Sequence, residues 1–277
     1  MTPSAGSPRV LTATVSNGAL ELAEPLDWPS GTRVRLVAWS GDTPPLAARI
    51  ELRLGARLAL RWKDKEITGI QAHIAALRRS IHAAWGVRLP PVGIVDDPGL
   101  PDHGWSLRRD GHPVADGALD PERVMLLAPD GAALPEAGLP GTDPTFGDPV
   151  RWVAATEAGA WGDAGMTVVA PATVLMVAFE HACLCEKQEL FGFEQLSVLL
   201  AATSPPLVQA LGERGVGQVR LLRLLRHLLG ENRSIAAFEA VLERALLEHD
   251  RLGAPEGPGG DAAWFAAVAA LTPRGAG

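Results

Sequence analysis

The first part of the chain alternates apolar and polar positions, as half-buried strands do. Residues 9–39 contain three such short stretches, and Asn17-Gly18 separates the first two. This dipeptide favours a two-residue hairpin turn, because both central residues of a type I′ turn need a positive φ. A joint rich in glycine and proline follows at Ser40–Pro45. The pattern therefore predicts a small β-hairpin domain over residues 1–45.

A helical period takes over further along the chain. Lys65–Trp85 carries large apolar residues at every third or fourth position, which is typical of a helix with one buried face. Gly86 is suited to end this helix. Strands in this region are predicted at Ile50–Leu54, near Arg57–Trp62, and at Leu89–Val95, Gly104–Arg109, Val124–Leu127 and Thr167–Val169. This order of elements predicts an α+β fold whose helices cover one face of a sheet.

Helical spacing dominates the second half of the chain. Pro171 starts a long helix, since proline is tolerated in a first turn. The pattern stays helical over Phe193–Asp250, with breaks at Ser204–Pro206 and near Gly215. The last of these helices is predicted to begin at Ser234 as its N-cap. Its inward-facing positions are Ile235, Phe238, Val241, Leu242 and Ala245.

Three segments interrupt or follow this pattern. Pro135–Pro149 is rich in proline and glycine and is predicted to be a loop, and Arg151–Gly159 is predicted to be a short helix. A linker begins at Arg251, and Asp261–Leu271 beyond it is predicted to form a small docking helix.

Composition narrows the possible functions. Hydrophobic residues make up 47% of the 277 residues, enough for a real core. The formal net charge of −7 repels phosphate backbones, so nucleic-acid binding is disfavoured. Two cysteines build no disulfide framework, and the chain shows neither a signal peptide nor an apolar run long enough to span a membrane. These features predict a cytoplasmic protein without direct membrane insertion.

The sequence gives little support for a catalytic or metal-binding site. Cys183 and Cys185 point about 200° apart on a helix, and His181 with Cys185 supplies only two of the four ligands of a structural zinc site. Both cysteines are therefore predicted to be small buried thiols. Asp96-Asp97-Pro98-Gly99 is explained as turn chemistry. No phosphate loop, G-x-S-x-G or dinucleotide motif occurs, so the sequence predicts no catalytic residue, no metal and no cofactor.

Three motifs carry a resemblance to a known family. Gly86–Asp97 resembles "G-x-x-L-P-P-V-x-I-x-D-N", and Gly141–Gly147 followed by Trp152 resembles "T-x-D-P-A-F-G…W-I". Gly165–Leu175 resembles "G-y-t-V-V-x-P-A-T-V-L". All three occur in the order found in FHIPEP proteins, the export-gate family of flagellar and virulence type III secretion. Separately, residues 15–39 resemble small β-rich antitoxin-like domains.

The family resemblance implies a non-enzymatic docking function. In that family a cleft between two subdomains receives export chaperones and their cargo. The positions that match this partner-binding cleft are Asp143, Phe146, Trp152 and Val177. Ala178 stands where the family has histidine, so the matching wall is expected to be apolar. Phe146 and Trp152 have an alternative interpretation as core side chains. The resemblance implies a protein partner resembling a chaperone or substrate, and it leaves homo-oligomer formation open.

The chain also departs from the family. Hairpins stand where the family has a multi-helix membrane domain, and a short tail stands in place of a last subdomain. Because the chain begins with Met1 and its N-terminal strands form a coherent pattern, we do not expect it to be a simple truncation of a family member. An alternative function is therefore an orphan regulatory or conflict-system adaptor that pairs with another protein through its N-terminal strands.

The predicted architecture is multi-subdomain α+β, with a sandwich-like α/β subdomain that carries a small insertion. The predicted division is a β-hairpin domain over 1–45, an α+β subdomain over 46–116 and 165–180, an inserted subdomain over 117–164, a helical subdomain over 181–250, and a linker and tail over 251–277.

Overall fold

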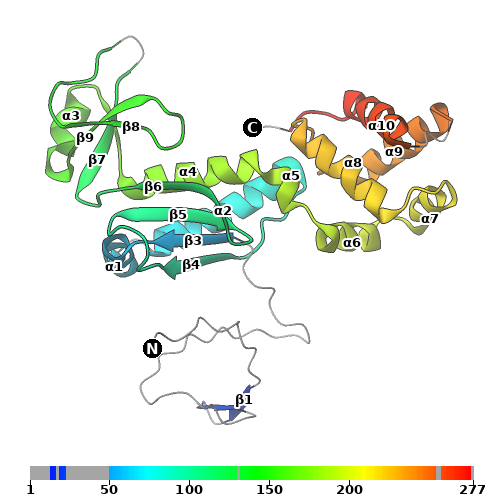
Figure 1. The fold of residues 1–277 in the computed structure, drawn as a ribbon, viewed down its shortest axis with the longest axis horizontal. Helices are drawn as coiled ribbons and strands as arrows, with labels where there is room; N and C mark the ends of the chain where they lie inside the picture. Colours follow the sequence, from blue (N-terminus) through cyan, green and yellow to red (C-terminus); the bar gives the residue numbers. More distant parts are fainter. Residues whose placement is uncertain are drawn as a thin grey trace. The chain divides into compact units, whose positions relative to one another are not determined.

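The computed structural model describes residues 13–16, 19–22, 50–65, 67–129, 132–253 and 257–275 (Figure 1). The chain divides into two compact units, Met1–Ala47 and Ala48–Gly277. In the first unit, β1 (Ala13–Ser16) pairs antiparallel with β2 (Ala19–Leu22). The two strands are two residues apart, which confirms the predicted hairpin. The third predicted strand, between residues 23 and 39, and the joint at Ser40–Pro45 lie outside the described residues.

The main sheet of the second unit has four strands in the order β4-β3-β5-β6. β3 (Ile50–Leu54) pairs parallel with β4 (Val92–Asp96) and antiparallel with β5 (Gly104–Arg109), which in turn pairs antiparallel with β6 (His112–Ala118). Ile50, Leu52 and Leu54 alternate inward from β3 and are buried. The predictions for β3, β4 and β5 are therefore confirmed, with the start of β4 shifted to Val92.

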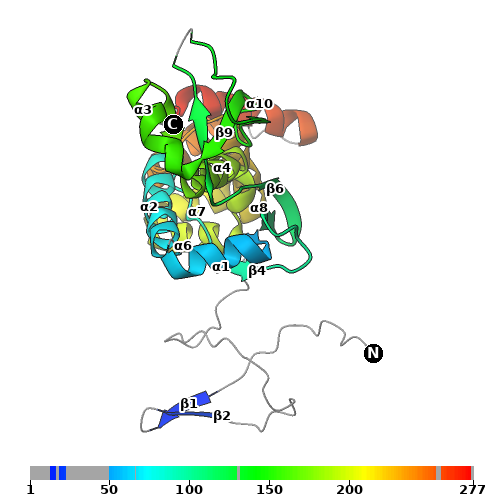
Figure 2. The same cartoon turned by 90° about the vertical axis from the view of Figure 1, so that its left-hand side faces the viewer.

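Two consecutive helices pack beside this sheet (Figures 1 and 2). α2 (Ile67–Trp85) buries the predicted stripe from Ile70 to Trp85, and Gly86 ends it with φ +74°, as predicted. The strand predicted near Arg57–Trp62 is wrong, because this stretch is α1 (Ala56–Lys65). Leu58, Ala59 and Trp62 are buried at helical spacing whereas Leu60 is exposed. A period of 3.6 therefore describes the stretch better than alternation does.

A second sheet is inserted between β6 and the long helix α4. Its order is β10-β7-β9-β8, and every pairing is antiparallel. Its bounds are β7 (Arg123–Leu127), β8 (Leu139–Thr142), β9 (Pro149–Ala154) and β10 (Thr167–Val169). Val124, Leu126 and Val153 form a small core with Trp161 on one face of this sheet.

Two predictions in this insertion are wrong. The expected loop Pro135–Pro149 contains β8, and the expected helix Arg151–Gly159 begins as β9. Helical structure starts only with the 3₁₀ turn η1 (Ala155–Glu157) and α3 (Ala158–Asp163). β9 pairs on one side with β7 and on the other with β8, so hydrogen bonds from two neighbours override its weak local preference.

Helices make up the remainder of the second unit (Figure 1). They are α4 (Pro171–Cys185), α5 (Lys187–Leu190), α6 (Phe193–Ala202), α7 (Pro205–Glu213), α8 (Gln218–Gly230), α9 (Phe238–Arg251) and α10 (Gly257–Leu271). The start at Pro171, both breaks and the tail helix are confirmed. None of the described helices is both long and apolar enough to cross a membrane.

Ser234 does not cap α9, which begins at Phe238 after Ala237. Its hydroxyl instead donates to Ala84 O at 2.6 Å and accepts from Ala236 N at 3.2 Å. The five side chains predicted to face inward from this region are all buried. Ser234 therefore ties the loop before α9 to the end of α2.

The α+β class is confirmed, and the predicted subdomain boundaries stay a prediction.

Candidate protein-docking site around Phe146

The loop between β8 and β9 is closed on itself by hydrogen bonds. Asp143 N donates to Asp148 O at 2.8 Å, and Gly147 N donates to Asp143 O at 3.0 Å. The Asp143 carboxylate Oδ1 accepts from Thr145 N at 2.7 Å and from Phe146 N at 3.3 Å. Gly147 has φ +79°, a conformation that favours glycine. Asp143 is only 7% exposed, so its side chain shapes the loop and does not line its surface.

Phe146 projects from this loop and is 61% exposed. Its ring meets the imidazole of His181 edge-on, with centroids 5.6 Å apart and planes at 70°. The interpretation of Phe146 as a core side chain is therefore wrong. An exposed aromatic ring whose backbone is fixed on both sides is the kind of side chain that anchors protein interfaces.

Val177 lies on α4, one turn before His181 and on the same side of the helix. Its side chain is half-buried, whereas His181 and Cys185 are exposed one and two turns further on. His181 Nε2 lies 3.4 Å from Cys185 Sγ. Phe146 and this face of α4 together form a surface that we call the Phe146 site, defined by Phe146, Val177, His181 and Cys185.

The structure brings together only two of the four residues that the family resemblance indicated. Phe146 and Val177 belong to the Phe146 site, whereas Asp143 supports it from within the loop. Trp152 is half-buried on β9 and packs against the main core, which agrees with its alternative interpretation. Gly141 makes room for it, since a Cβ there would come within 2.7 Å of the indole. Ala178 is buried and so does not form part of the exposed wall.

Sequence reasoning missed two residues of the site, His181 and Cys185. Their spacing of four and eight residues from Val177 could have placed both on the same helix face. Of the two cysteines predicted to be buried, Cys183 is buried as predicted, whereas Cys185 is exposed. Burial raises the pKa of the Cys183 thiol to about 12, so only Cys185 belongs to the accessible chemistry of α4.

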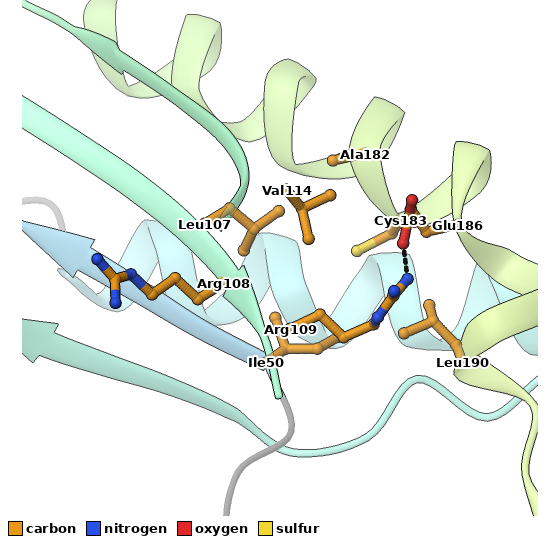
Figure 3. A pocket seen from close by; sticks show the side chains of 9 residues that line it. All are labelled: Ile50, Leu107, Arg108, Arg109, Val114, Ala182, Cys183, Glu186 and Leu190. Carbon is orange, nitrogen blue, oxygen red and sulfur yellow. Dashed lines mark ion pairs between the residues drawn. The ribbon is translucent and has the colours of Figure 1, made fainter. Parts of the chain in front are cut away.

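A small pocket lies on the other side of α4, between β5, β6 and α5 (Figure 3). An ion pair joins Arg109 to Glu186, and the apolar side chains of Leu107, Val114 and Cys183 form part of the wall. Its volume of about 10 Å³ gives room for about one water molecule. This pocket therefore helps to join the sheet to α4 and is too small for an organic ligand.

A wider and shallower groove of about 400 Å³ lies between the end of α6 and the start of α9. Leu199, Ala202, Ala237 and Phe238 line it together with Glu239, whose carboxylate accepts from Ser204 N at 2.9 Å. Its open, mostly apolar walls contain no cluster of converging polar groups of the kind that a small-molecule site needs.

The other residues considered as candidates for a chemical role have structural roles instead. Asp97 Oδ1 accepts from Gly99 N at 2.9 Å, which confirms the predicted turn. This bond and the ion pair with Arg53 hold the pKa of Asp97 below its ordinary value. Within the described part of the chain, no three His, Cys, Asp or Glu side chains are grouped closely enough to hold a metal ion.

Comparison with known protein families decides the relationship. The model of the FHIPEP family matches residues 41–254, about three quarters of the chain. The chain belongs to the FHIPEP family. The match covers both four-stranded sheets and helices α1 to α9, including the Phe146 site. Helix α10 lies beyond it.

Curated FHIPEP relatives include flagellar proteins. The flagellar biosynthesis protein FlhA of Caulobacter vibrioides is 27% identical over 197 residues, which cover 70% of this chain and 28% of that protein. The putative truncated flagellar export/assembly protein LfhA of Escherichia coli K12 is 25% identical over 207 residues, covering 74% of this chain and 35% of that protein. The chain thus spans about a third or less of the relatives that it matches.

Solved structures share the fold at low sequence identity. The Chlamydia pneumoniae CdsV protein superposes with a TM-score of 0.64 at 20% identity, covering 83% of this chain and 66% of that one. The nonameric SctV-C of EPEC superposes with a TM-score of 0.57 at 16% identity, covering 82% of this chain and 66% of that one. This FHIPEP chain is therefore related to the cytoplasmic domains of type III export-gate proteins.

Proposed function

We propose that the chain is a non-enzymatic docking module of type III export, and that the Phe146 site is where a partner protein binds. The observation that carries this proposal is Phe146 itself. Aromatic rings that become buried are among the side chains that contribute most to the affinity of a protein interface. The Asp143 hydrogen bonds order the loop before binding, so less entropy is lost when a partner docks.

The surroundings of Phe146 favour a partner with an apolar anchor and a basic flank. Val177 supplies apolar area, while Glu180 beside it faces His73 at 3.9 Å and adds negative charge. The chain as a whole carries a formal net charge of −7. An export chaperone or its cargo with an aliphatic helix face and nearby lysines would match this surface.

Location and assembly follow from the same proposal. The partner would meet this chain in the cytoplasm, and copies of the chain would assemble into a ring. Two structural relatives are described as nonameric, and another is described in complex with CdsO. These relatives support both protein partners and oligomer formation.

A matched pair of variants tests the site. Phe146→Asp places a charge where the partner would bury a ring, and should abolish capture of an export chaperone–cargo complex by the tagged chain. Phe193→Asp is the control, because Phe193 is 47% exposed on α6 and outside the Phe146 site. Equal capture by the unchanged chain and by Phe146→Asp, with both variants folded by circular dichroism, would refute the docking proposal.

The β1–β2 hairpin supports a second candidate function, that of an adaptor. It belongs to the separate compact unit Met1–Ala47, and a two-stranded ribbon has two edges on which another strand can pair. Deleting residues 1–45 should then remove a partner that Phe146→Asp leaves bound. Loss of the same partner in both variants would contradict a separate adaptor role.

A further inference from the structure

Helix α10 is held on α8 and α9 by an aromatic anchor. Trp264 is 0% exposed, and its indole Nε1 donates to Ala245 O of α9 at 2.8 Å. Phe265 packs on the imidazole of His227 of α8, with centroids 5.5 Å apart. The FHIPEP match ends at residue 254, and α10 begins beyond it at Gly257.

An ion-pair clamp fixes the start of α10 to α8. Asp261 accepts from Arg220 Nε at 2.6 Å and from Arg223 Nη1 at 3.0 Å. The Arg220 guanidinium also lies over the Trp264 ring, 4.8 Å from its centroid. Arg220 thus contacts both anchors of α10, and whatever disturbs Arg220 weakens the whole attachment.

His249 is the residue that meets both Arg220 and Trp264. It is 2% exposed, its ring lies edge-on to Trp264 at 5.7 Å, and its Nε2 is 3.3 Å from Arg220 Nη1. A guanidinium only donates, so Nε2 must accept and the neutral ring carries its proton on Nδ1. Among the residues that the structure describes, buried Nδ1 has no hydrogen-bond partner. The arrangement therefore requires a neutral His249.

We propose that α10 is an acid-releasable helix, docked while His249 is neutral and released when His249 is protonated. A proton on Nε2 removes the only acceptor that faces Arg220 Nη1 from this ring and puts two cations 3.3 Å apart. The nearby carboxylates already have arginine partners, Asp261 in the clamp and Asp250 with Arg214 Nε at 2.6 Å. Release would expose Trp264, Phe265 and Val268 as an apolar ligand for another helix-binding surface. This device does not depend on the Phe146 site.

The charged and titratable groups around His249 come from four elements. They are Arg220, Arg223 and His227 of α8, Asp261 of α10, Arg214 after α7, and Glu248 and Asp250 of α9. Burial first and Arg220 second lower the pKa of His249 from its ordinary value of 6.5. A lowered pKa means that stability is intact above pH 6.5 and falls as the pH drops toward the folded-state value. If the released ring titrates near 6.5, the docked population relative to the released one falls by up to about tenfold between pH 7.5 and 5.5, the full factor applying to a ring that stays neutral while docked.

Hydrogen exchange on the full chain tests this proposal. Backbone amides of residues 261–272 should lose up to about tenfold in protection between pH 7.5 and 5.5, after correction for the intrinsic rate. Amides of β3 and β5 serve as the internal reference and should keep their protection. His249→Gln offers Arg220 an acceptor that does not titrate, so its α10 protection should not change with pH.

His227→Gln is the matched control, since His227 contacts Phe265 of α10 whereas the imidazole 3.3 Å from Arg220 is that of His249. It should retain the same response. A response that persists in His249→Gln, or that disappears in His227→Gln, would overturn the proposal. If His249→Gln does not dock α10 at any pH, titration of the His249 ring by NMR in the unchanged chain decides. An apparent pKa at or above 6.5 there would also overturn it.

Discussion

The loop that carries Phe146 and the helix that carries Trp264 use aromatic side chains in opposite ways. Phe146 is exposed, and its position is set by backbone hydrogen bonds to Asp143. Trp264 is fully buried, and arginine, histidine and a backbone carbonyl surround its ring. The exposed ring of Phe146 contributes little to the free energy of folding and leaves apolar area for a partner. The buried ring of Trp264 contributes to the free energy of folding and, while α10 is docked, leaves no apolar area for a partner.

The difference shows that the side chains proposed for recognition and those that stabilise the fold are different residues in this chain. A side chain that contributes to stability is surrounded by its own fold, whereas a side chain available for recognition is held only through its backbone. The four predictions below would break this contrast if they fail. They run from the largest expected effect to the smallest.

The two cysteines of α4 should differ most. Cys185 shares the exposed face of the Phe146 site, whereas Cys183 points into the core with its pKa raised to about 12. At pH 8 a thiol with that pKa is ionised in only about one molecule in ten thousand. Iodoacetamide should therefore label Cys185 at least about a thousandfold faster, as measured by mass spectrometry of the folded chain. Equal labelling in the folded state would mean that this face of α4 is not the accessible one.

Trp264→Ala should be the most destabilising of the point changes considered. Removing a buried tryptophan leaves a cavity and removes the indole N–H bond to Ala245 O, with an expected loss of about 3–5 kcal/mol in the free energy of unfolding. Urea denaturation followed by circular dichroism measures the loss. Leu271→Ala, at an exposed position of the same helix, is the control and should stay within about 0.5 kcal/mol. A loss below about 1 kcal/mol for Trp264→Ala would show that α10 contributes little to the fold.

Asp143→Ala should have an intermediate and local effect. It removes the acceptor for two loop N–H groups, so we expect a loss of about 1 kcal/mol and faster exchange at Thr145 and Phe146. Asp143→Asn keeps the acceptor oxygen and should restore most of the protection. If the asparagine variant exchanges as fast as the alanine variant, the charge of Asp143 matters more than its hydrogen bonds.

Phe146→Ala should change stability least, by no more than about 0.5 kcal/mol, because most of its ring already faces solvent. The same change should weaken partner capture strongly. A large loss of stability would instead identify Phe146 as a packing residue and remove the contrast with Trp264.

The pattern of apolar and polar residues along the chain was sufficient to predict much of the fold. The stripe on α2, the alternation in β3, the proline start of α4 and the tail helix all appear where the sequence places them. Each has a strong period or an unambiguous start or stop residue. The family motifs were equally informative, since the matched region includes all three of them.

The secondary structure of short segments with mixed patterns could not be predicted from the segments alone. Residues 57–62 carry apolar side chains that suit a strand or one helical turn, and burial of Trp62 beside Leu58 selects the helix. Residues 149–154 become β9 because two strands are available to pair with them. In both places the deciding energy comes from neighbours distant in sequence.

The sequence by itself determined the family, the α+β class and the identity of Phe146 as a candidate contact. Only the tertiary structure decided that Phe146 is exposed, that His181 lies beneath it, that Cys185 shares this surface and that Asp143 works from inside the loop. The physical reason is that periodicity states which side chains share a face, whereas burial depends on which other element covers that face. For α4 one face packs into the core, and the face that carries Val177 and His181 remains open to a partner.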